Sequence, residues 1–121
     1  MNVLIVESNP ELGRLWRRHL ERLGAWVMTA SSQTMATDIL AEHQFNAIVL
    51  DLMLDEGSAL AVSDFASYRQ PDAKVVFVTN TSFFSDGSIF AHAPNACAFI
   101  QSATPPGDLA ELVTHYGAGV A

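Results

Sequence analysis

The chain has 121 residues, half of them apolar, which suffices for one domain with its own core and argues against two domains or a disordered chain. Thirteen acidic residues against six lysines and arginines give a net charge of −7, which disfavours direct binding to a nucleic acid. Cys97 is the single cysteine, no apolar run is long enough to span a bilayer, and no secretory signal is recognisable, so we expect a cytoplasmic protein without internal disulfides or membrane contact.

Five short apolar runs of strand length alternate with segments of helical periodicity. The runs are NVLIV (2–6), AWVMTA (25–30), FNAIVL (45–50), KVVFVT (74–79) and CAFI (97–100). Nearly continuous apolar runs of this length are typical of parallel strands, because helices cover such a sheet on both faces.

The first predicted helix follows Asn9, a good N-cap, and Pro10, which a first turn tolerates, and it ends at Gly24. Ser31 or Ser32 caps a second helix, and a third covers residues 58–68. The apolar positions of these helices are Leu12, Trp16, Leu20 and Leu23 in the first, Met35, Ala36, Ile39 and Leu40 in the second, and Leu60, Ala61, Phe65 and Tyr68 in the third.

The last predicted helix carries an amphipathic stripe formed by Leu109, Leu112, Val113 and Tyr116. The segment 80–96 contains Asp86-Gly87-Ser88 and Pro94, so only a short, poorly formed helix is predicted there. This order predicts an α/β fold, namely a doubly wound five-stranded parallel sheet with helices on both faces and right-handed crossovers. Residues 1–121 are expected to form a single domain with no output domain.

Ligands of doubly wound sheets bind outside the carboxyl ends of the strands, so the residues that end each strand are the candidates for a site. The first strand ends on Glu7-Ser8, the third on Asp51, the fourth on Thr79-Asn80, and the fifth runs into Gln101-Ser102-Ala103. A polar residue where one strand leaves the core has an ordinary structural explanation. Acids and a hydroxyl after three separate strands favour a functional site.

Four segments make the chain resemble the receiver domain of bacterial two-component response regulators, the CheY-like superfamily, along essentially its whole length. They are VLIVESNP, IVLDLMLDEGSAL, VVFVTNTS and ACAFIQSATPPGDL. The resemblance implies that Asp51 is the phospho-acceptor, that Thr79 supplies the switch hydroxyl, and that Phe99 is the aromatic partner of that switch.

The resemblance also shows where this chain departs from the family pattern. Family members hold Mg²⁺ with two adjacent acids, the acceptor aspartate and a backbone carbonyl two residues beyond it, which implies Glu7, Asp51 and the Met53 carbonyl here, with Ser8 replacing one acid. The usual lysine position falls on Ser102, or on Gln101 if the register slips by one, and Ala103 stands at the usual proline position. Mg²⁺ binding is therefore expected to be weak and phosphorylation of Asp51 weak or absent.

Arg14, Arg18 and Arg22 share one face of the first helix, hereafter the Arg stripe. Such a stripe is either a solvated face or a docking surface, and the resemblance implies docking of a histidine kinase or phosphotransfer domain. Phe83, Phe84, Ile89 and Phe90 either pack onto the sheet or present a partner or homodimer surface over 83–90. The four histidines show no metal-ligand spacing.

Three functions come into consideration for such a chain. The first is a stand-alone receiver-like signalling module that binds partners with a degenerate phosphorylation site, and the second is a functional phosphorelay receiver in which Glu7 and Asp51 still hold the metal. The third, a small nucleotide-binding protein or enzyme, lacks support because ESNPELG contains no glycine-rich phosphate cradle and the chain has no G-x-S-x-G elbow. We therefore expect a signalling module that is not an enzyme.

Overall fold

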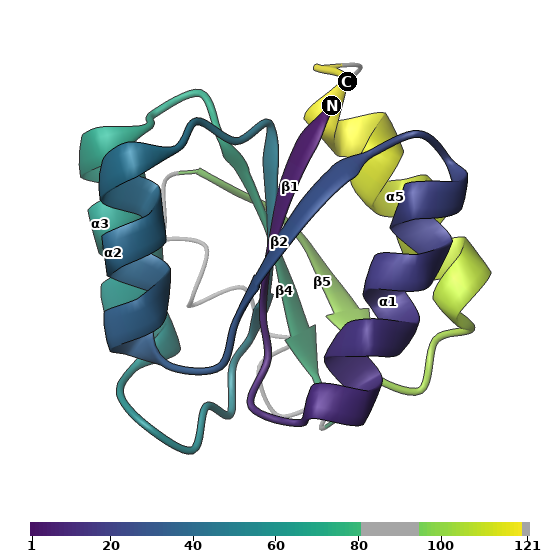
Figure 1. Cartoon of the computed structure of the whole chain (residues 1–121), viewed down its shortest axis with the longest axis horizontal. Coiled ribbons are helices and arrows are strands. Elements are labelled where there is room, and N and C mark those ends of the chain that lie inside the picture. Colours follow the sequence, from purple (N-terminus) through teal and green to yellow (C-terminus); the bar gives the residue numbers. More distant parts are fainter. Residues whose placement is uncertain (81–94, 120–121) are drawn as a thin grey trace.

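A parallel sheet lies between two layers of helices in the computed structural model, which describes residues 1–80 and 95–119 (Figure 1). Its strands are β1 (Asn2–Val6), β2 (Trp26–Ala30), β3 (Ala47–Asp51), β4 (Lys74–Thr79) and β5 (Ala96–Gln101). They lie in the order β2-β1-β3-β4-β5, and every neighbouring pair is parallel. The predicted doubly wound five-stranded sheet is confirmed.

Helices cover both faces of this sheet. Helices α1 (Pro10–Arg22) and α5 (Pro106–Gly117) pack against one face, and α2 (Gln33–Glu42) and α3 (Ala59–Arg69) cover the other (Figure 1). The predicted apolar surface at 83–90 lies outside the described residues. So does the helix predicted within 80–96, of which only residues 80, 95 and 96 are described. None of the described helices has the length and apolar character needed to cross a membrane.

The core has two layers because alternate residues of each strand face opposite sides. In β3, Ile48 and Leu50 belong to the cluster beneath α2 and α3, whereas Ala47 and Val49 belong to the cluster beneath α1 and α5. All four are fully buried. This burial on both faces explains why the strands read as unbroken apolar runs in the sequence.

Helix starts follow the capping chemistry of the sequence. The Asn9 side-chain oxygen accepts hydrogen bonds from the backbone N–H groups of Glu11 (3.0 Å) and Leu12 (3.3 Å). Ser32, and not Ser31, caps α2, since its hydroxyl accepts from the Met35 N–H at 3.2 Å. Several strand limits differ from the predicted ones by one or two residues, which is the usual scatter at element ends.

The predicted buried stripe of the third helix is wrong for Leu60 and Tyr68, whereas Phe65 is half-buried and packs against the core. Its fully packed residues are Ala59, Val62, Ser63 and Ala66, whereas Tyr68 is 85% exposed and Leu60 39% exposed. The small and apolar residues of α3 are not confined to one face of the helix. Their spacing alone therefore did not identify the face that packs against the sheet.

Three further predicted apolar positions, Leu23, Met35 and Leu112, are also exposed. Each lies at the margin of the face that its helix buries, or at the helix end.

Candidate functional site

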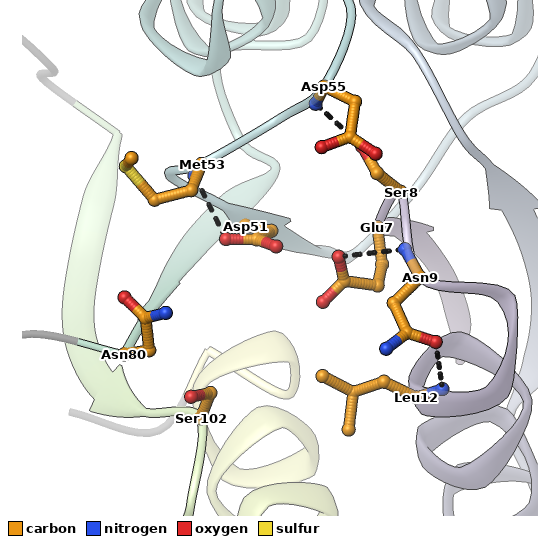
Figure 2. A pocket seen from close by; sticks show the side chains of 9 residues that line it. All are labelled: Glu7, Ser8, Asn9, Leu12, Asp51, Met53, Asp55, Asn80 and Ser102. Carbon is orange, nitrogen blue, oxygen red and sulfur yellow. Dashed lines mark hydrogen bonds between the residues drawn. The ribbon is translucent and has the colours of Figure 1, made fainter.

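A cavity of about 250 Å³ lies at the carboxyl ends of the strands, hereafter the carboxylate pocket (Figure 2). It is lined by Glu7, Ser8, Asn9, Leu12, Asp51, Met53, Asp55, Asn80 and Ser102. Strands β1, β3 and β4 and the segment after β5 thus deliver side chains to one place, as the strand-end prediction required.

Asp51 stands at the end of β3, half-buried, and is positioned by its own loop. Its Oδ1 accepts a hydrogen bond from the Met53 backbone N–H at 2.9 Å. The Met53 side chain is 58% exposed at the mouth of the pocket (Figure 2). A carboxylate held by a backbone donor two residues on leaves its other oxygen toward the cavity.

Glu7 is a buried carboxyl group with only 6% of its surface exposed. It accepts a hydrogen bond from the Asn9 N–H at 3.3 Å. Burial, and then the hydrogen bond and negative charge of Asp51, raise the pKa of Glu7 to about 8, against a weaker opposing effect of the Asn9 and Ser8 backbone donors. Without a cation in the pocket, Glu7 therefore keeps its proton near neutral pH and donates it toward Asp51.

Ser8 does not act as a simple replacement for an acid. Its hydroxyl accepts from the Asp55 N–H at 2.9 Å and donates to the Ser31 carbonyl at 3.3 Å. These bonds tie the loop after β1 to the loops after β3 and β2. The Ser8 oxygen is thus already engaged in joining three loops.

Ser102 and Gln101, the two candidates for the usual lysine position, differ in where they lie. Ser102 lines the carboxylate pocket, and its N–H donates to the Thr79 carbonyl at 2.8 Å. Gln101 ends β5, is exposed and does not line the pocket. Asn80, identified in the sequence only as a strand end, also points into the pocket (Figure 2).

Thr79 and Phe99 lie on neighbouring strands but outside the lining of the pocket. Thr79 is buried and pairs in register with Gln101, two residues beyond Phe99. Phe99 is half-buried and stacks on Phe77, with ring centroids 5.2 Å apart. Their places on neighbouring strands are compatible with the roles that the resemblance implies, which stay predictions.

The oxygen donors of the pocket are of the type that Mg²⁺ takes. Glu7 and Asp51 are the predicted carboxylate ligands and the Met53 carbonyl is the third predicted ligand, and Asp55 also lines the pocket. Within residues 1–80 and 95–119, no group of three or more His, Cys, Asp or Glu side chains is arranged to hold a metal. Glu7 would have to lose its proton before it could coordinate a cation.

The Arg stripe lies on the exposed surface of α1. In the described part of the chain, the one salt bridge joins Arg17 Nε to Glu21 Oε2 at 3.3 Å, so Arg14, Arg18 and Arg22 form no ion pair there. The local acidic neighbours thus leave most of the positive charge of α1 available.

Comparison with known proteins supports the same interpretation as the geometry. A family model described as the response regulator receiver domain matches residues 3–113. The response regulator protein PilR of Pseudomonas aeruginosa is 28% identical over 110 residues, which cover 91% of this chain. The chain spans 24% of the length of the curated relatives that it matches.

Solved structures agree in fold. A CheY-like response regulator receiver domain protein from Methanospirillum hungatei has a TM-score of 0.88 at 21% identity, covering 98% of this chain and 94% of that one. The response regulator TrrA from Thermotoga maritima, solved in complex with Mg²⁺-BeF, has a TM-score of 0.81 at 22% identity, with 95% and 97% of the two chains covered. At such identities these similarities concern the fold alone.

Proposed function

Because the chain belongs to the response regulator receiver family, we propose that it is a partner-binding module of two-component signalling in which Asp51 is a poor phosphoryl acceptor. Its effect would pass through another protein that binds to its surface. We do not propose enzymatic turnover, and the net charge of −7 argues against direct contact with nucleic acid.

The observation that supports this proposal most directly is that no positively charged side chain of the described residues lines the carboxylate pocket. The nine lining residues include neither lysine nor arginine. Lys74 is the single lysine of the sequence, and it begins β4, at the opposite end of the strand from the pocket. No other lysine of this sequence can therefore replace the lysine that family members have at the position of Ser102.

The chemistry of phosphoryl transfer explains why this matters. An Asp51 oxygen would attack phosphorus while the bond from phosphorus to the donor breaks, and the transferred group carries negative charge throughout. Losing one positioned stabilising group typically lowers the rate of an enzyme about 10²–10³-fold. Here the lysine is absent and one metal-ligating acid is replaced by Ser8, whose hydroxyl is engaged with Asp55 and Ser31.

The second candidate is a working phosphorelay receiver, and the position of Glu7 favours it. Glu7 forms a hydrogen bond with Asp51 and lines the same pocket, so after losing its proton it could hold Mg²⁺ with Asp51 and the Met53 carbonyl. This candidate predicts that Asp51→Asn abolishes both labelling and signalling.

We propose a histidine kinase or phosphotransfer domain as the partner at the Arg stripe. The three arginines are exposed and make no ion pair within the described residues, which suits a surface that meets an acidic patch. Self-association through the predicted 83–90 surface remains a prediction.

The test is the intact mass of the protein after incubation with acetyl phosphate, with and without Mg²⁺. We expect little or no gain of a phosphoryl group in the wild type. The double variant Ser8→Asp/Ser102→Lys restores the missing groups, so we expect its labelling to be faster by roughly 10²-fold or more and to depend on Mg²⁺.

Two variants serve as controls in this experiment. Asp51→Asn in the double-variant background must abolish the labelling, and Ser8→Asp/Gln101→Lys places the lysine one residue outside the pocket. Mg²⁺-dependent labelling of the wild type as fast as that of Ser8→Asp/Ser102→Lys would contradict the first proposal and favour the phosphorelay.

A further inference from the structure

A second hollow of about 260 Å³ lies on the other side of the end of β1, hereafter the edge groove. Its walls include Gly13, Arg14 and Arg17 of α1, Thr29 and Ala30 at the end of β2, and Met35 of α2. In the view of Figure 1, β2 runs between α1 and α2, which cover opposite faces of the sheet. Glu7 lines both hollows and separates them.

Gly13 keeps this groove open without a structural need for glycine. It is buried within α1, where glycine lowers helix stability relative to alanine. A Cβ atom placed on it would come no nearer than 3.8 Å to the Glu7 Cβ, which is ordinary contact. Packing therefore does not exclude a side chain at this position, whereas one would narrow the groove.

Positive charge gathers at the rim of the groove. Arg14 and Arg17 are exposed and one helical turn apart. Arg17 shares an exposed salt bridge with Glu21, whereas Arg14 forms no ion pair within the described ranges. The chain as a whole has a net charge of −7, so an acidic partner is repelled by most of its surface and attracted at these cations. Charge complementarity thus selects an acidic occupant.

The size and lining of the groove indicate a protein segment. Small-molecule sites usually enclose roughly 300–1,000 Å³, and this open groove is smaller. The Met35 side chain, 45% exposed, and buried Ala30 supply apolar surface to the lining of the groove. This space suits one apolar side chain flanked by carboxylates.

We propose that the edge groove binds an acidic segment of a partner protein, with one apolar side chain between Gly13 and Met35 and carboxylates against Arg14 and Arg17. This inference rests on the proposed role as a partner-binding module and is independent of phosphoryl transfer at Asp51. It names a surface distinct from the Arg stripe, which shares only Arg14 with it.

NMR titration of the ¹⁵N-labelled chain tests the proposal, with synthetic peptides of the patterns Glu-Glu-Leu-Glu-Glu and Lys-Lys-Leu-Lys-Lys as probes. We expect saturable shifts of the Gly13, Arg14, Thr29 and Met35 amide signals with the acidic peptide, at a Kd of about 1 mM or tighter. The basic peptide is expected to cause no such shifts. Absence of saturable shifts with the acidic peptide, or shifts elsewhere, overturns the proposal.

Two substitutions affect the groove but not the Arg stripe. Gly13→Leu fills the groove and is expected to abolish binding, and Arg17→Glu is expected to weaken it roughly three- to tenfold. The matched control Arg22→Glu changes the same charge on the same helix outside the groove, so it leaves peptide binding unchanged. Thermal unfolding of each variant establishes that it is folded.

The outcomes separate this inference from the proposed function. Equal peptide binding by Arg17→Glu and the wild type overturns the proposal. Identical shifts with free glutamate or inorganic phosphate also overturn it, because they would indicate a small-anion site. Loss of binding to a histidine kinase in Arg22→Glu with intact peptide binding would assign kinase docking to the Arg stripe. If neither Arg22→Glu nor Arg18→Glu changes the binding of the histidine kinase while peptide binding persists, kinase docking at the Arg stripe is contradicted and the groove proposal stands.

Discussion

At the scale of single residues, Glu7 carries the most consequential chemistry. Burial and the neighbouring Asp51 raise its pKa to about 8 from an unfolded-state value near 4.5. The folded protein therefore binds more protons than the unfolded chain between these two values. The stability that goes with this bound proton is fully present below about pH 4.5 and is lost as the pH rises toward 8.

We therefore predict that Glu7 makes the free energy of unfolding decrease between about pH 5 and pH 8, with a slope of at most about 1.4 kcal/mol per pH unit. Glu7→Gln cannot ionise and is expected to remove this decrease, so its advantage over the wild type grows with pH. Urea unfolding of both proteins at several pH values measures the difference.

Glu11→Gln is the matched control for this experiment, because Glu11 is an exposed acid in the first turn of α1. A Glu7→Gln curve parallel to the wild-type curve between pH 5 and 8 would show that Glu7 is ionised throughout. Added Mg²⁺ that flattened the wild-type curve would indicate coordination by the ionised form.

At the scale of secondary-structure elements, α1 combines a good start with an unfavourable interior residue. Asn9 caps the helix through two backbone N–H groups, and Trp16 and Leu20 bury its inner face. Gly13 interrupts this otherwise consistent pattern. Packing does not require a glycine at this position, which agrees with the proposal that Gly13 keeps the edge groove open for binding.

We predict that Gly13→Ala raises the free energy of unfolding by about 0.5–1 kcal/mol, because alanine is the better helix former and its methyl group meets no clash. Chemical denaturation measures this gain. The same variant is expected to bind the acidic peptide more weakly than the wild type.

Gly57 provides the contrasting control for that prediction. Its φ is +90°, and an added Cβ would lie 2.3 Å from the Gln33 Cβ. Gly57→Ala is therefore expected to destabilise the fold. A destabilising effect of Gly13→Ala would contradict this account of α1. A stabilising effect of Gly57→Ala would contradict the use of backbone conformation and Cβ contacts to predict both results.

At the scale of the whole molecule, stability depends on a sheet that is buried on both faces. Ile48 on the central strand β3 is fully buried beneath α2 and α3, whereas Tyr68 on the same side of the protein is 85% exposed. Two large side chains on the same side of the sheet, one on β3 and one on α3, thus have opposite environments.

We predict that Ile48→Ala lowers the free energy of unfolding by about 2–5 kcal/mol, through lost burial and the cavity that remains. Tyr68→Ala is expected to change it by less than about 0.5 kcal/mol. Urea denaturation compares the two. A large loss in Tyr68→Ala would mean that Tyr68 packs against the chain, as its place in the helical pattern first suggested.

The loops after β1, β2 and β3 behave as one unit at this scale. Ser8 joins Ser31 and Asp55, and Gln33 accepts from the Ser58 N–H at 2.8 Å while its own N–H donates to the Glu56 carbonyl. These bonds hold the rims of the carboxylate pocket and the edge groove together. A change in one hollow therefore has a physical route to the other.

Much of this protein was determined by local features of the sequence. The apolar runs specified the strands, most clearly β1, β3 and β4, which are buried on both faces. Asn9 and Pro10 specified the start of α1 because capping is local chemistry. The alternation of strands and helices specified the doubly wound sheet. The order of strand ends also indicated that Glu7, Asp51 and Ser102 would meet at one edge, as they do in the carboxylate pocket.

Tertiary structure decided what depends on neighbours distant in the chain. Four features depend on such neighbours: the inner face of α3, the bonding of the Ser8 hydroxyl, the position of Ser102 in the pocket lining and the raised pKa of Glu7. The edge groove likewise exists only because α1, β2 and α2 meet around Gly13. Residue type and spacing encode local conformation and burial, but hydroxyl partners, pKa values and cavities arise from contacts that form only when the chain folds.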